Sequence, residues 1–378
     1  MRVLLVNNGS PVVGGAEVVV GETARLLRGA GHEPVAFGLE SPSRPRVYSI
    51  AARRSVERLV RRVAPDVAHV HNAYEGLTLS VIDGLSRLGV PVVMTLHDYR
   101  AVCPNGYLLA RDGPCLRCPA AGSTFPAVAH RCVRGSVIRS AVAAAECGLN
   151  RRRGRYGVPR VLIAPSRFLQ RVMSEAGLPP ERIRVVPNPV AVPTSRRVLP
   201  ERPRFLFAGR LVEQKGLDVL LDASSMLDPG STVVICGTGR LERHVRERVT
   251  TERLPVELRG HVARSDVADE LRGATAAVVP SLWFENAPLA VLEAAASGVA
   301  VVASRTGALP ELVAHGVTGV LVRRGEAAAL AAALNDLGCS PHRAAELGRR
   351  GRERVRRRND PGRYLSALLD TYDEAVAA

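Results

Sequence analysis

The chain has 378 residues, enough for two domains of common size, and with 46% hydrophobic residues its composition is that of a globular protein. Its net charge of +16 would suit nucleic acid, an anionic membrane or an anionic ligand. Aromatic residues make up only 4% of the chain and no nucleic-acid motif accompanies the arginines, so we expect no nucleic-acid partner. A solvated arginine-rich surface and peripheral contact with an anionic membrane both stay open.

No uninterrupted apolar run reaches the length of a membrane span. The apolar run at residues 3–6 is too short for a secretion signal and is typical of a buried first strand. We therefore expect a cytoplasmic protein with mostly reduced cysteines, which would meet a membrane only peripherally, at the inner face of the plasma membrane.

The first half begins with an expected strand at 2–7, a glycine-rich turn at 9–17 and a helix at 18–28. The turn contains Gly14 and Gly15. Strand, glycine turn and helix let backbone N–H groups approach a phosphate or a sugar closely. The G-x-G-x-x-G spacing of a dinucleotide site is missing, and a plain tight turn is the alternative.

Two further expected strands, at 66–71 and 91–96, are followed by polar residues. His71 stands at the end of the first strand and His97 directly after the second. The alternation with helices at 51–62 and 75–88 predicts a parallel sheet, whose ligands bind at the carboxyl ends of the strands. Both histidines are therefore functional candidates.

The alternation breaks at 99–135, which contains Cys103, Cys115, Cys118 and Cys132. Their spacing is compatible with a tetrahedral zinc site, and four unpaired thiols are the alternative. Such a zinc ion would be structural and would fasten a loop beside His97.

Residues 191–202 lack periodicity and are expected to form a linker. The alternation then restarts with expected helices at 217–227, 240–249 and 265–272, a loop at 307–311 and a helix from 326. The expected strands lie at 204–208, 232–236, 256–259, 276–280, 299–303 and 319–321. We therefore expect two doubly wound halves, with the site in the cleft between them.

Lys215 is the single lysine among 52 lysine and arginine residues, and it shares an expected strand-exit loop with Arg210. A guanidinium can fork across two phosphate oxygens, while an ammonium acts as a point charge. Together they could stabilise the negative charge on a departing diphosphate. Two ordinary surface charges are the alternative.

The stretch 281–298, SLWFENAPLAVLEAAASG, holds Glu285 and Glu293 with seven residues between them. Pro288 and the apolar run after it predict a helix that ends at Gly298, so Glu293 lies about one turn inside. A helix N-terminus suits a phosphate, and a carboxylate one turn in can accept hydrogen bonds from two hydroxyls. The stretch predicts a sugar-nucleotide pocket with the ribose at Glu293 and the sugar towards Glu285. An amphipathic helix with a solvated glutamate is the alternative.

Eight short motifs run along the chain in a fixed order. They are GGAE at 14–17, HD at 97–98, PSRF at 165–168, VVPNPV at 185–190, FAGRLVEQKG at 207–216, CGTG at 236–239, ENAPLAVLEAAASG at 285–298 and TGALPELV at 306–313. Together they resemble the retaining glycosyltransferases of family 4 and cover most of the chain. Pro189 replaces the glycine more usual in the PNG-type turn, and the cysteine-rich insert suggests a subgroup.

The resemblance implies an α/β protein of GT-B fold, with two Rossmann-like doubly wound domains facing a central cleft. Residues 1–190 would form the acceptor-side domain, which carries the insert at 99–135. Residues 203–358 would bind the nucleotide sugar. A C-terminal helix at 360–374 would pack back on the first domain.

The resemblance also implies transfer from a UDP- or GDP-linked sugar with retention of anomeric configuration. The acceptor would be a hydroxyl of a glycan, a lipid carrier or a small metabolite, and the absence of a D-x-D motif argues against a catalytic divalent metal. The implied catalytic residues are His97, Arg210, Lys215 and Glu285, and the implied donor-binding residues are Gly14, Gly15, Gly237, Asn286, Ala287, Leu289 and Glu293. A GT-B sugar-nucleotide epimerase and a non-catalytic nucleotide-sugar-binding protein are the alternative functions.

Overall fold

The computed structural model describes the chain except residues 9–13, 39–46, 75, 195–196 and 378. The chain divides into two compact units. The first unit comprises Met1–Pro189 and Pro361–Ala378, and the second comprises Val190–Asp360. Across the described ranges, no helix is long and apolar enough to cross a membrane.

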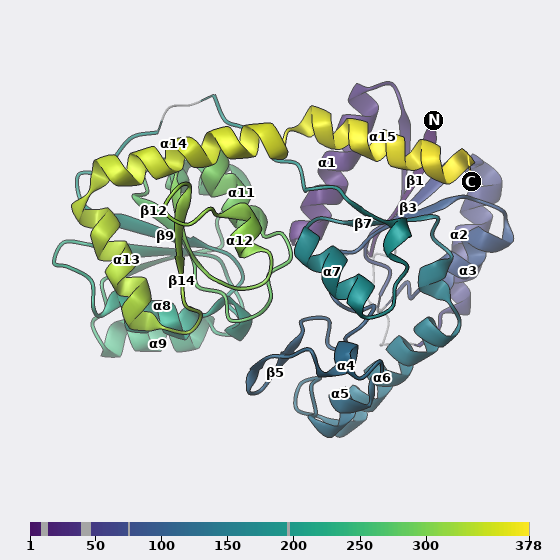
Figure 1. Cartoon of the computed structure of the whole chain (residues 1–378), viewed down its shortest axis with the longest axis horizontal. Helices are drawn as coiled ribbons and strands as arrows, with labels where there is room; N and C mark the ends of the chain where they lie inside the picture. Colours follow the sequence, from purple (N-terminus) through teal and green to yellow (C-terminus); the bar gives the residue numbers. More distant parts are fainter. Residues whose placement is uncertain (9–13, 39–46, 75, 195–196, 378) are drawn as a thin grey trace. The chain divides into compact units, whose positions relative to one another are not determined.

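The first unit is built on a parallel sheet with the described strands in the order β2-β1-β3-β4-β7-β8. Figure 1 labels β1, β3 and β7 of this sheet. Its strands are β1 (Arg2–Val6), β2 (Glu33–Phe37), β3 (Val67–Val70), β4 (Val92–Thr95), β7 (Val161–Ala164) and β8 (Ile183–Val185). Every residue of β3, β4 and β7 is buried, as expected for short apolar strands covered on both faces.

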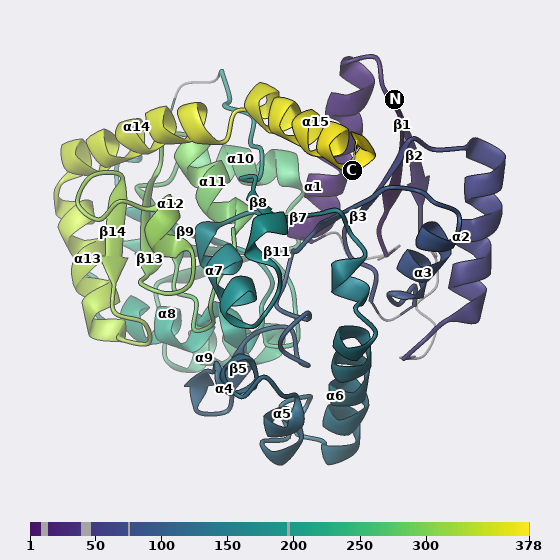
Figure 2. The ribbon, with the colours of Figure 1, turned by 45° about the vertical axis from the view of Figure 1, so that its right-hand side comes forward.

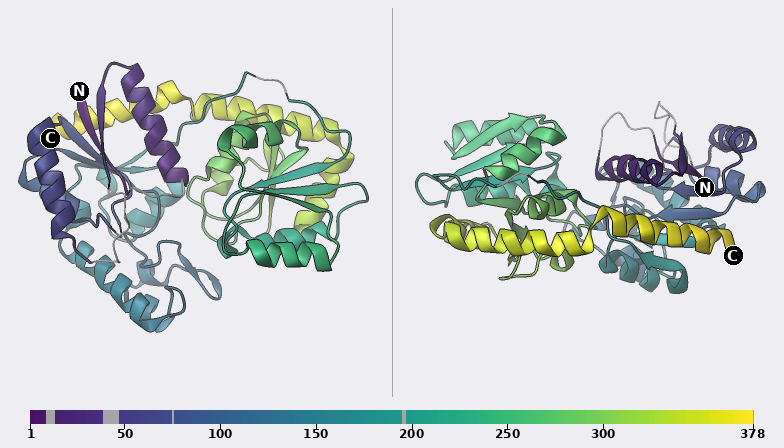
Figure 3. Two further views of the ribbon diagram at one scale, coloured as in Figure 1. Left: turned by 180° about the vertical axis from the view of Figure 1, so that it is seen from behind. Right: turned by 90° about the horizontal axis from the view of Figure 1, so that it is seen from above.

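One face of this sheet is covered by α1 (Gly15–Gly29) and by the C-terminal helix α15 (Pro361–Ala377). Figure 3 shows α15 crossing α1, with which it is in contact. Tyr364 and Leu368 of α15 join Val3 and Leu5 of β1 in one buried cluster. The hydroxyls of Thr23 and Tyr364 lie 2.7 Å apart and form a buried hydrogen bond between α1 and α15.

The remaining helices of the first unit surround the sheet and form the insert. They are α2 (Ile50–Val63), α3 (Ser80–Arg87), α4 (Arg117–Ala120), α5 (Phe125–Ala129), α6 (Val137–Arg152) and α7 (Arg167–Glu175). The insert also contains a small antiparallel ladder, β5 (Leu109–Ala110) with β6 (Gly113–Pro114). Figure 2 shows α5 beside α6, with which it is in contact.

The second unit has its own parallel sheet, with the described strands in the order β11-β10-β9-β12-β13-β14. The strands are β9 (Arg204–Ala208), β10 (Thr232–Cys236), β11 (Val256–Gly260), β12 (Ala276–Val279), β13 (Ala300–Ser304) and β14 (Gly319–Val322). The doubly wound parallel sheets expected from the sequence are confirmed.

Side chains alternate between the two faces of β9, because successive residues of a strand point in opposite directions. On one face, Phe205 and Phe207 pack in a hydrophobic cluster that also contains residues of α8 (Leu217–Ser224), α9 (Glu242–Thr251) and α13 (Ala327–Cys339). Leu206 joins the opposite cluster. That cluster takes residues from α10 (Arg264–Arg272), α11 (Leu289–Ala296) and α12 (Leu309–Leu312). The arginine-rich α14 (Pro341–Arg358) contacts α11 and ends the unit.

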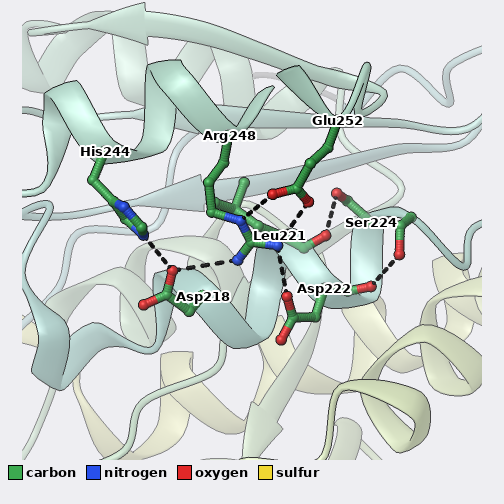
Figure 4. Close-up of polar contacts among 8 residues, drawn as sticks. Asp218, Leu221, Asp222, Ser224, His244, Arg248 and Glu252 are labelled. Carbon is green, nitrogen blue, oxygen red and sulfur yellow. Dashed lines mark hydrogen bonds and ion pairs between the residues drawn. The ribbon is translucent and has the colours of Figure 1, made fainter. Parts of the chain in front are cut away.

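A polar network ties α8 to α9 on one side of this sheet (Figure 4). Arg248 lies at its centre: Nη2 donates to Asp222 Oδ1 at 2.8 Å and Nε donates to Glu252 Oε1 at 2.6 Å. Its Nη1 lies 3.4 Å from Asp218, which also contacts His244. These acidic partners raise the pKa of Arg248, so the charge at the centre of the network is permanent.

Two expected element boundaries were wrong. The helix expected at 75–88 begins only at Ser80, because Thr78 has φ +53° and cannot continue a right-handed helix (residue 75 lies outside the described residues). The Thr78 hydroxyl accepts from the backbone N–H of Ser49 at 3.1 Å and so ties this segment to the N-cap of α2. The loop expected at 307–311 contains α12, a single helical turn with proline near its start.

Candidate functional site

The strand order of the second unit's sheet defines where its loops converge. β10 and β11 lie on one side of β9, and β12, β13 and β14 lie on the other. In open parallel sheets, ligands bind at the carboxyl ends of the strands where the winding reverses in this way. The loop after β9 carries Arg210 and Lys215, and the loop after β12 carries Glu285. Two loops far apart in sequence therefore bring their charged residues to one edge.

Lys215 and Glu285 meet directly at this edge. Lys215 Nζ donates to Glu285 Oε1 at 2.7 Å, and Ser281 Oγ donates to the same oxygen at 2.6 Å. The Glu285 side chain is 3% exposed and that of Lys215 is 20% exposed. The ammonium also lies 5.5 Å from the ring centroid of Trp283, a cation–π distance. Because an ammonium has three donors, it can hold this carboxylate and still donate to a ligand.

Main-chain contacts fix the two loops against one another. Leu282 N donates to Gln214 O at 2.9 Å. Gly216 has φ +72°, and a Cβ atom at this position would lie 2.0 Å from the carbonyl oxygen of Pro280. Only glycine allows this approach. The Lys215–Glu285 pair is therefore held by a rigid backbone.

A third loop, which follows β13, supports the second. Ala308 N donates to the carbonyl of Glu285 at 2.8 Å, and the Thr306 hydroxyl donates to that of Trp283 at 3.1 Å. Gly307, at φ +57°, leaves room for the Glu285 backbone: a Cβ atom would lie 2.3 Å from its oxygen. These contacts give the TGALPELV motif a supporting role to which the sequence alone did not point.

The helix that follows Glu285 begins where the sequence predicts, with Pro288 as N-cap and Leu289 as its first residue. Asn286 is 6% exposed and lies with Ala287 just before the first turn. Gly298, with φ +73°, follows the C-cap residue Ser297 as a left-handed stop. The start of this helix therefore follows the loop that carries Glu285 directly along the chain.

Glu293 lies on α11 and faces an arginine that the sequence analysis missed. Arg264, the first residue of α10, places Nε 2.8 Å and Nη2 2.7 Å from Glu293 Oε1. Burial raises the pKa of Glu293, and the arginine acts in the opposite direction. The second carboxylate oxygen makes no hydrogen bond within the described part of the chain. It is free to accept a hydroxyl.

Gly237 lies in the loop after β10, with φ +143°, and a Cβ atom there would lie 1.9 Å from the carbonyl oxygen of Gly209. Leu211 N donates to Thr238 O at 2.9 Å. These contacts shape the loop that carries Arg210. Arg210 itself is exposed, and its guanidinium forms no ion pair with any described residue.

The other candidates, Gly14, Gly15 and His97, belong to the first unit. Gly14 is the N-cap of α1, and its N–H donates to Glu17 Oε2 at 2.9 Å. Gly15 is the first helical residue. The preceding part of the glycine-rich turn, residues 9–13, lies outside the described residues. This helix start follows β1, at the point where the order of the first unit's sheet reverses between β1 and β3.

His97 follows β4 and contacts His71 from the end of the neighbouring β3. His71 Nδ1 lies 2.9 Å from His97 Nε2. The other nitrogen of His71 is buried without a hydrogen-bond partner among the described residues. Burial lowers the pKa of His97 to about 4 and that of His71 well below its ordinary value. Both rings are therefore neutral near pH 7, and one donates its proton to the other.

A third histidine, His69, lies behind this pair and was missed because it stands inside a strand. Its ring centroid is 4.0 Å from that of His71. Its two nitrogens lie 2.7 Å from the hydroxyls of Tyr372 and Thr95. Burial lowers its pKa to about 3. The histidine cluster therefore extends to α15, which carries Tyr372.

The structure does not show the zinc site that the spacing of the four insert cysteines suggested. No group of three or more His, Cys, Asp or Glu side chains within the described ranges is arranged to hold a metal ion. The Cys103 thiol instead donates to Asn105 Oδ1 at 3.0 Å. Burial raises the pKa of Cys103 to about 11 and that of Cys118 to about 12. With Cys115 and Cys132 they remain free thiols.

Two family models match the chain. The model described as Glycosyltransferase Family 4 matches residues 13–192, and the one described as Glycosyl transferases group 1 matches residues 202–338. Together they include every candidate residue named above.

Two curated relatives come from Mycolicibacterium smegmatis. Alpha-maltose-1-phosphate synthase is 29% identical over 77% of this chain and 74% of its own length. A GDP-mannose-dependent alpha-(1-6)-phosphatidylinositol monomannoside mannosyltransferase is 35% identical over 47% of this chain and 49% of its own length.

Among solved structures, HepE of Anabaena in complex with UDP and glucose has a TM-score of 0.72 at 20% identity, with 99% of both chains covered. Sucrose-phosphate synthase of Thermosynechococcus elongatus has a TM-score of 0.73 at 18% identity, covering 100% of this chain and 99% of that one. At these identities the likeness establishes the fold.

Proposed function

We propose a donor site for this chain on the basis of its family. The chain belongs to glycosyltransferase family 4 and is therefore a retaining glycosyltransferase of GT-B fold that uses a nucleotide-sugar donor. The proposed donor site is formed by the loops that follow β9 and β12. The observation that carries this proposal is the Lys215–Glu285 pair, a buried carboxylate and a cation held at the reversal of the sheet.

In this proposal Lys215 and Arg210 bind the diphosphate of the donor, beside the N–H groups at the start of α11. Glu285 and the backbone of residues 286–289 hold the sugar. The free oxygen of Glu293 accepts a ribose hydroxyl. Gly237 acts indirectly, by shaping the Arg210 loop. Gly14, Gly15 and His97 of the first unit complete the donor contacts.

The reaction then needs little covalent help from the protein. The bond between the anomeric carbon and the phosphate oxygen breaks, and a bond to the acceptor oxygen forms on the same face of the sugar. The acceptor proton passes to the departing phosphate. Lys215 and Arg210 stabilise the charge that develops on this leaving group, which is the largest contribution such a step requires. We propose that they do so without a divalent metal.

For the donor we propose a UDP-linked hexose, since HepE, which shares the fold, is solved with UDP and with UDP-glucose. GDP-mannose is the second candidate, because it is the named donor of the mannosyltransferase relative. The acceptor is a hydroxyl of a glycan, a lipid carrier or a small metabolite. The +16 net charge favours peripheral contact with an anionic membrane at the inner face of the plasma membrane.

We further propose that residues 1–190, together with the C-terminal helix, form the acceptor-side domain. Residues 203–358 form the donor-side domain, and residues 191–202 are the linker.

A thermal-shift screen of nucleotides and nucleotide sugars, with and without EDTA, tests the proposal. A ligand at a hundred times its dissociation constant stabilises the folded state by about 2.7 kcal/mol. We expect one UDP- or GDP-sugar to raise Tm and EDTA to leave the shift unchanged. If no nucleotide raises Tm, the donor site is wrongly assigned; if EDTA removes the shift, the metal-free mechanism is wrong.

A further inference from the structure

Helix α6 (Val137–Arg152) buries small or polar residues and exposes apolar ones, which is the reverse of an ordinary surface helix. Its buried residues are Ser140, Ala144, Cys147 and Asn150, which are small or polar. Its exposed residues include Ile138, Ala141, Val142 and Ala145, which follow one another at the i, i+3, i+4, i+7 spacing of a single helical face. Ile138 is 76% exposed. In water a helix normally turns its apolar face inward. This one therefore presents an apolar stripe with no partner in its own unit.

Neighbouring parts of the insert extend this apolar surface. Phe125, on the contacting helix α5, is 72% exposed and Leu116, before α4, is 42% exposed. Of the 11 large hydrophobic residues that are exposed in the described chain, five lie between residues 116 and 142. We call these five the insert surface: Leu116, Phe125, Val137, Ile138 and Val142. Such clustering marks an interaction site, whereas single exposed apolar residues are ordinary.

The charges around the insert surface have one sign. Exposed arginines in or next to it are Arg111, Arg117, Arg131, Arg134, Arg139, Arg152 and Arg153. The one exposed acidic residue between 111 and 153 is Asp112, and it is ion-paired with Arg117. An occupant of this surface must therefore be apolar where it touches Ile138 and Phe125, and anionic around them.

We propose that the insert surface docks on an anionic phospholipid bilayer. The apolar side chains would enter the boundary between headgroups and acyl chains, while the arginines contact phosphate groups and keep their charge in the headgroup layer. A second copy of this chain fits less well, because it brings the same surplus of positive charge. The inference deepens the membrane contact proposed above. It rests on that part of the proposed function alone, since the Lys215–Glu285 pair that carries the donor-site proposal belongs to the other unit.

The test is vesicle co-sedimentation of the full-length protein with phosphatidylcholine vesicles and with phosphatidylcholine–phosphatidylglycerol vesicles, at low and high salt. We expect binding only to the anionic vesicles, weakened by salt. The double variant Ile138→Ser/Val142→Ser should bind these vesicles about tenfold more weakly, because it loses apolar contact area without losing charge. The matched control is Val198→Ser/Val317→Ser, two residues of the second unit that are 69% and 47% exposed. It should bind like the wild type.

Two further measurements separate this inference from the proposed function. The nucleotide-sugar thermal shift should be the same in the Ile138→Ser/Val142→Ser variant as in the wild type, since loss of the shift would mean a damaged fold. Analytical ultracentrifugation tests whether a second copy of this chain, and not a membrane, covers the insert surface. The proposal is overturned if the wild type fails to bind anionic vesicles, if the apolar variant binds them as well as the control does, or if a wild-type dimer dissociates in the apolar variant.

Discussion

Lys215 Nζ lies 2.7 Å from Oε1 of Glu285, and these two residues come from loops that leave different strands of one sheet. A buried carboxylate holds the single lysine of the chain in place, with Ser281 donating to the same oxygen. An incoming diphosphate finds this cation already oriented, so little side-chain entropy is lost on binding. Two predictions follow from this site, and two more follow from the histidines of the first unit.

Replacing Lys215 by arginine should keep the positive charge but lose most of the activity. The planar guanidinium cannot occupy the position of a compact ammonium between Glu285 and the Trp283 ring. We expect kcat to fall by about 10²–10³, the range found when one donor to a developing charge is lost. Steady-state kinetics with the donor identified in the thermal-shift screen measures the effect. The control is Arg240→Lys, at an exposed ion pair with Glu213, which should retain full activity.

Arg264→Gln should shift the acid limit of donor binding to higher pH. Burial raises the pKa of Glu293 and Arg264 lowers it, so loss of the arginine lets this pKa rise further. The carboxylate is then protonated at a higher pH and stops accepting the ribose hydroxyl. UDP affinity measured against pH should therefore fall earlier on acidification than in the wild type. Arg272→Gln, which removes an exposed pair with Asp269 on the same helix, should leave the profile unchanged. Identical profiles for Arg264→Gln and wild type would contradict the role of Glu293.

His71→Phe should lower kcat and leave the affinity for the nucleotide unchanged. His71 touches His97 but belongs to a different unit from Lys215, so we regard it as a positioning residue that fixes the orientation of the His97 ring. We expect about a tenfold loss, as is usual when a supporting partner of a functional side chain is removed. His71→Asn, whose amide can still hydrogen-bond to His97, should recover part of the rate. Equal rates for the two variants would refute positioning through this hydrogen bond.

The buried histidines should make the protein less stable in mild acid. Their folded-state pKa values, about 3 for His69 and about 4 for His97, lie below the ordinary value of about 6.5 in the unfolded chain. The unfolded state therefore binds more protons as the pH falls from about 6.5 towards 4, and stability decreases in this window. Urea unfolding at about pH 7 and about pH 5 measures the loss. Between the two pH values, the free energy of unfolding should fall less in a His97→Asn variant than in the wild type. An equal fall would contradict a contribution of His97 to the acid sensitivity.

The alternation of strands and helices was enough to predict both sheets and to place Lys215 and Glu285 in loops at strand ends. It could not show that these two residues touch, because their contact depends on β9 and β12 being neighbours, and strand order is set by packing rather than by local sequence. Arg264 was missed for a similar reason: it reaches Glu293 from another helix, with no motif around it. The cysteine spacing suggested zinc, but spacing along the chain alone does not bring four thiols to one metal ion.

The buried face of helix α6 could not be predicted from local sequence either. The choice of its buried face depends on which neighbours the helix meets. Ser140 and Cys147 face inward, where Ser140 Oγ accepts from Val133 N at 3.0 Å and the Cys147 thiol donates to Arg100 O at 3.4 Å. These polar contacts, which no periodicity rule anticipates, leave Ile138 outside.

The central claim is that the loops after β9 and β12 bind the diphosphate of a nucleotide sugar. Isothermal titration of UDP into the wild type and into Arg210→Gln/Lys215→Met tests it most directly, with circular dichroism to show that the variant is folded. Removing two charge-assisted phosphate contacts should weaken binding at least about 100-fold. If the folded double variant binds UDP as tightly as the wild type, the diphosphate site lies elsewhere.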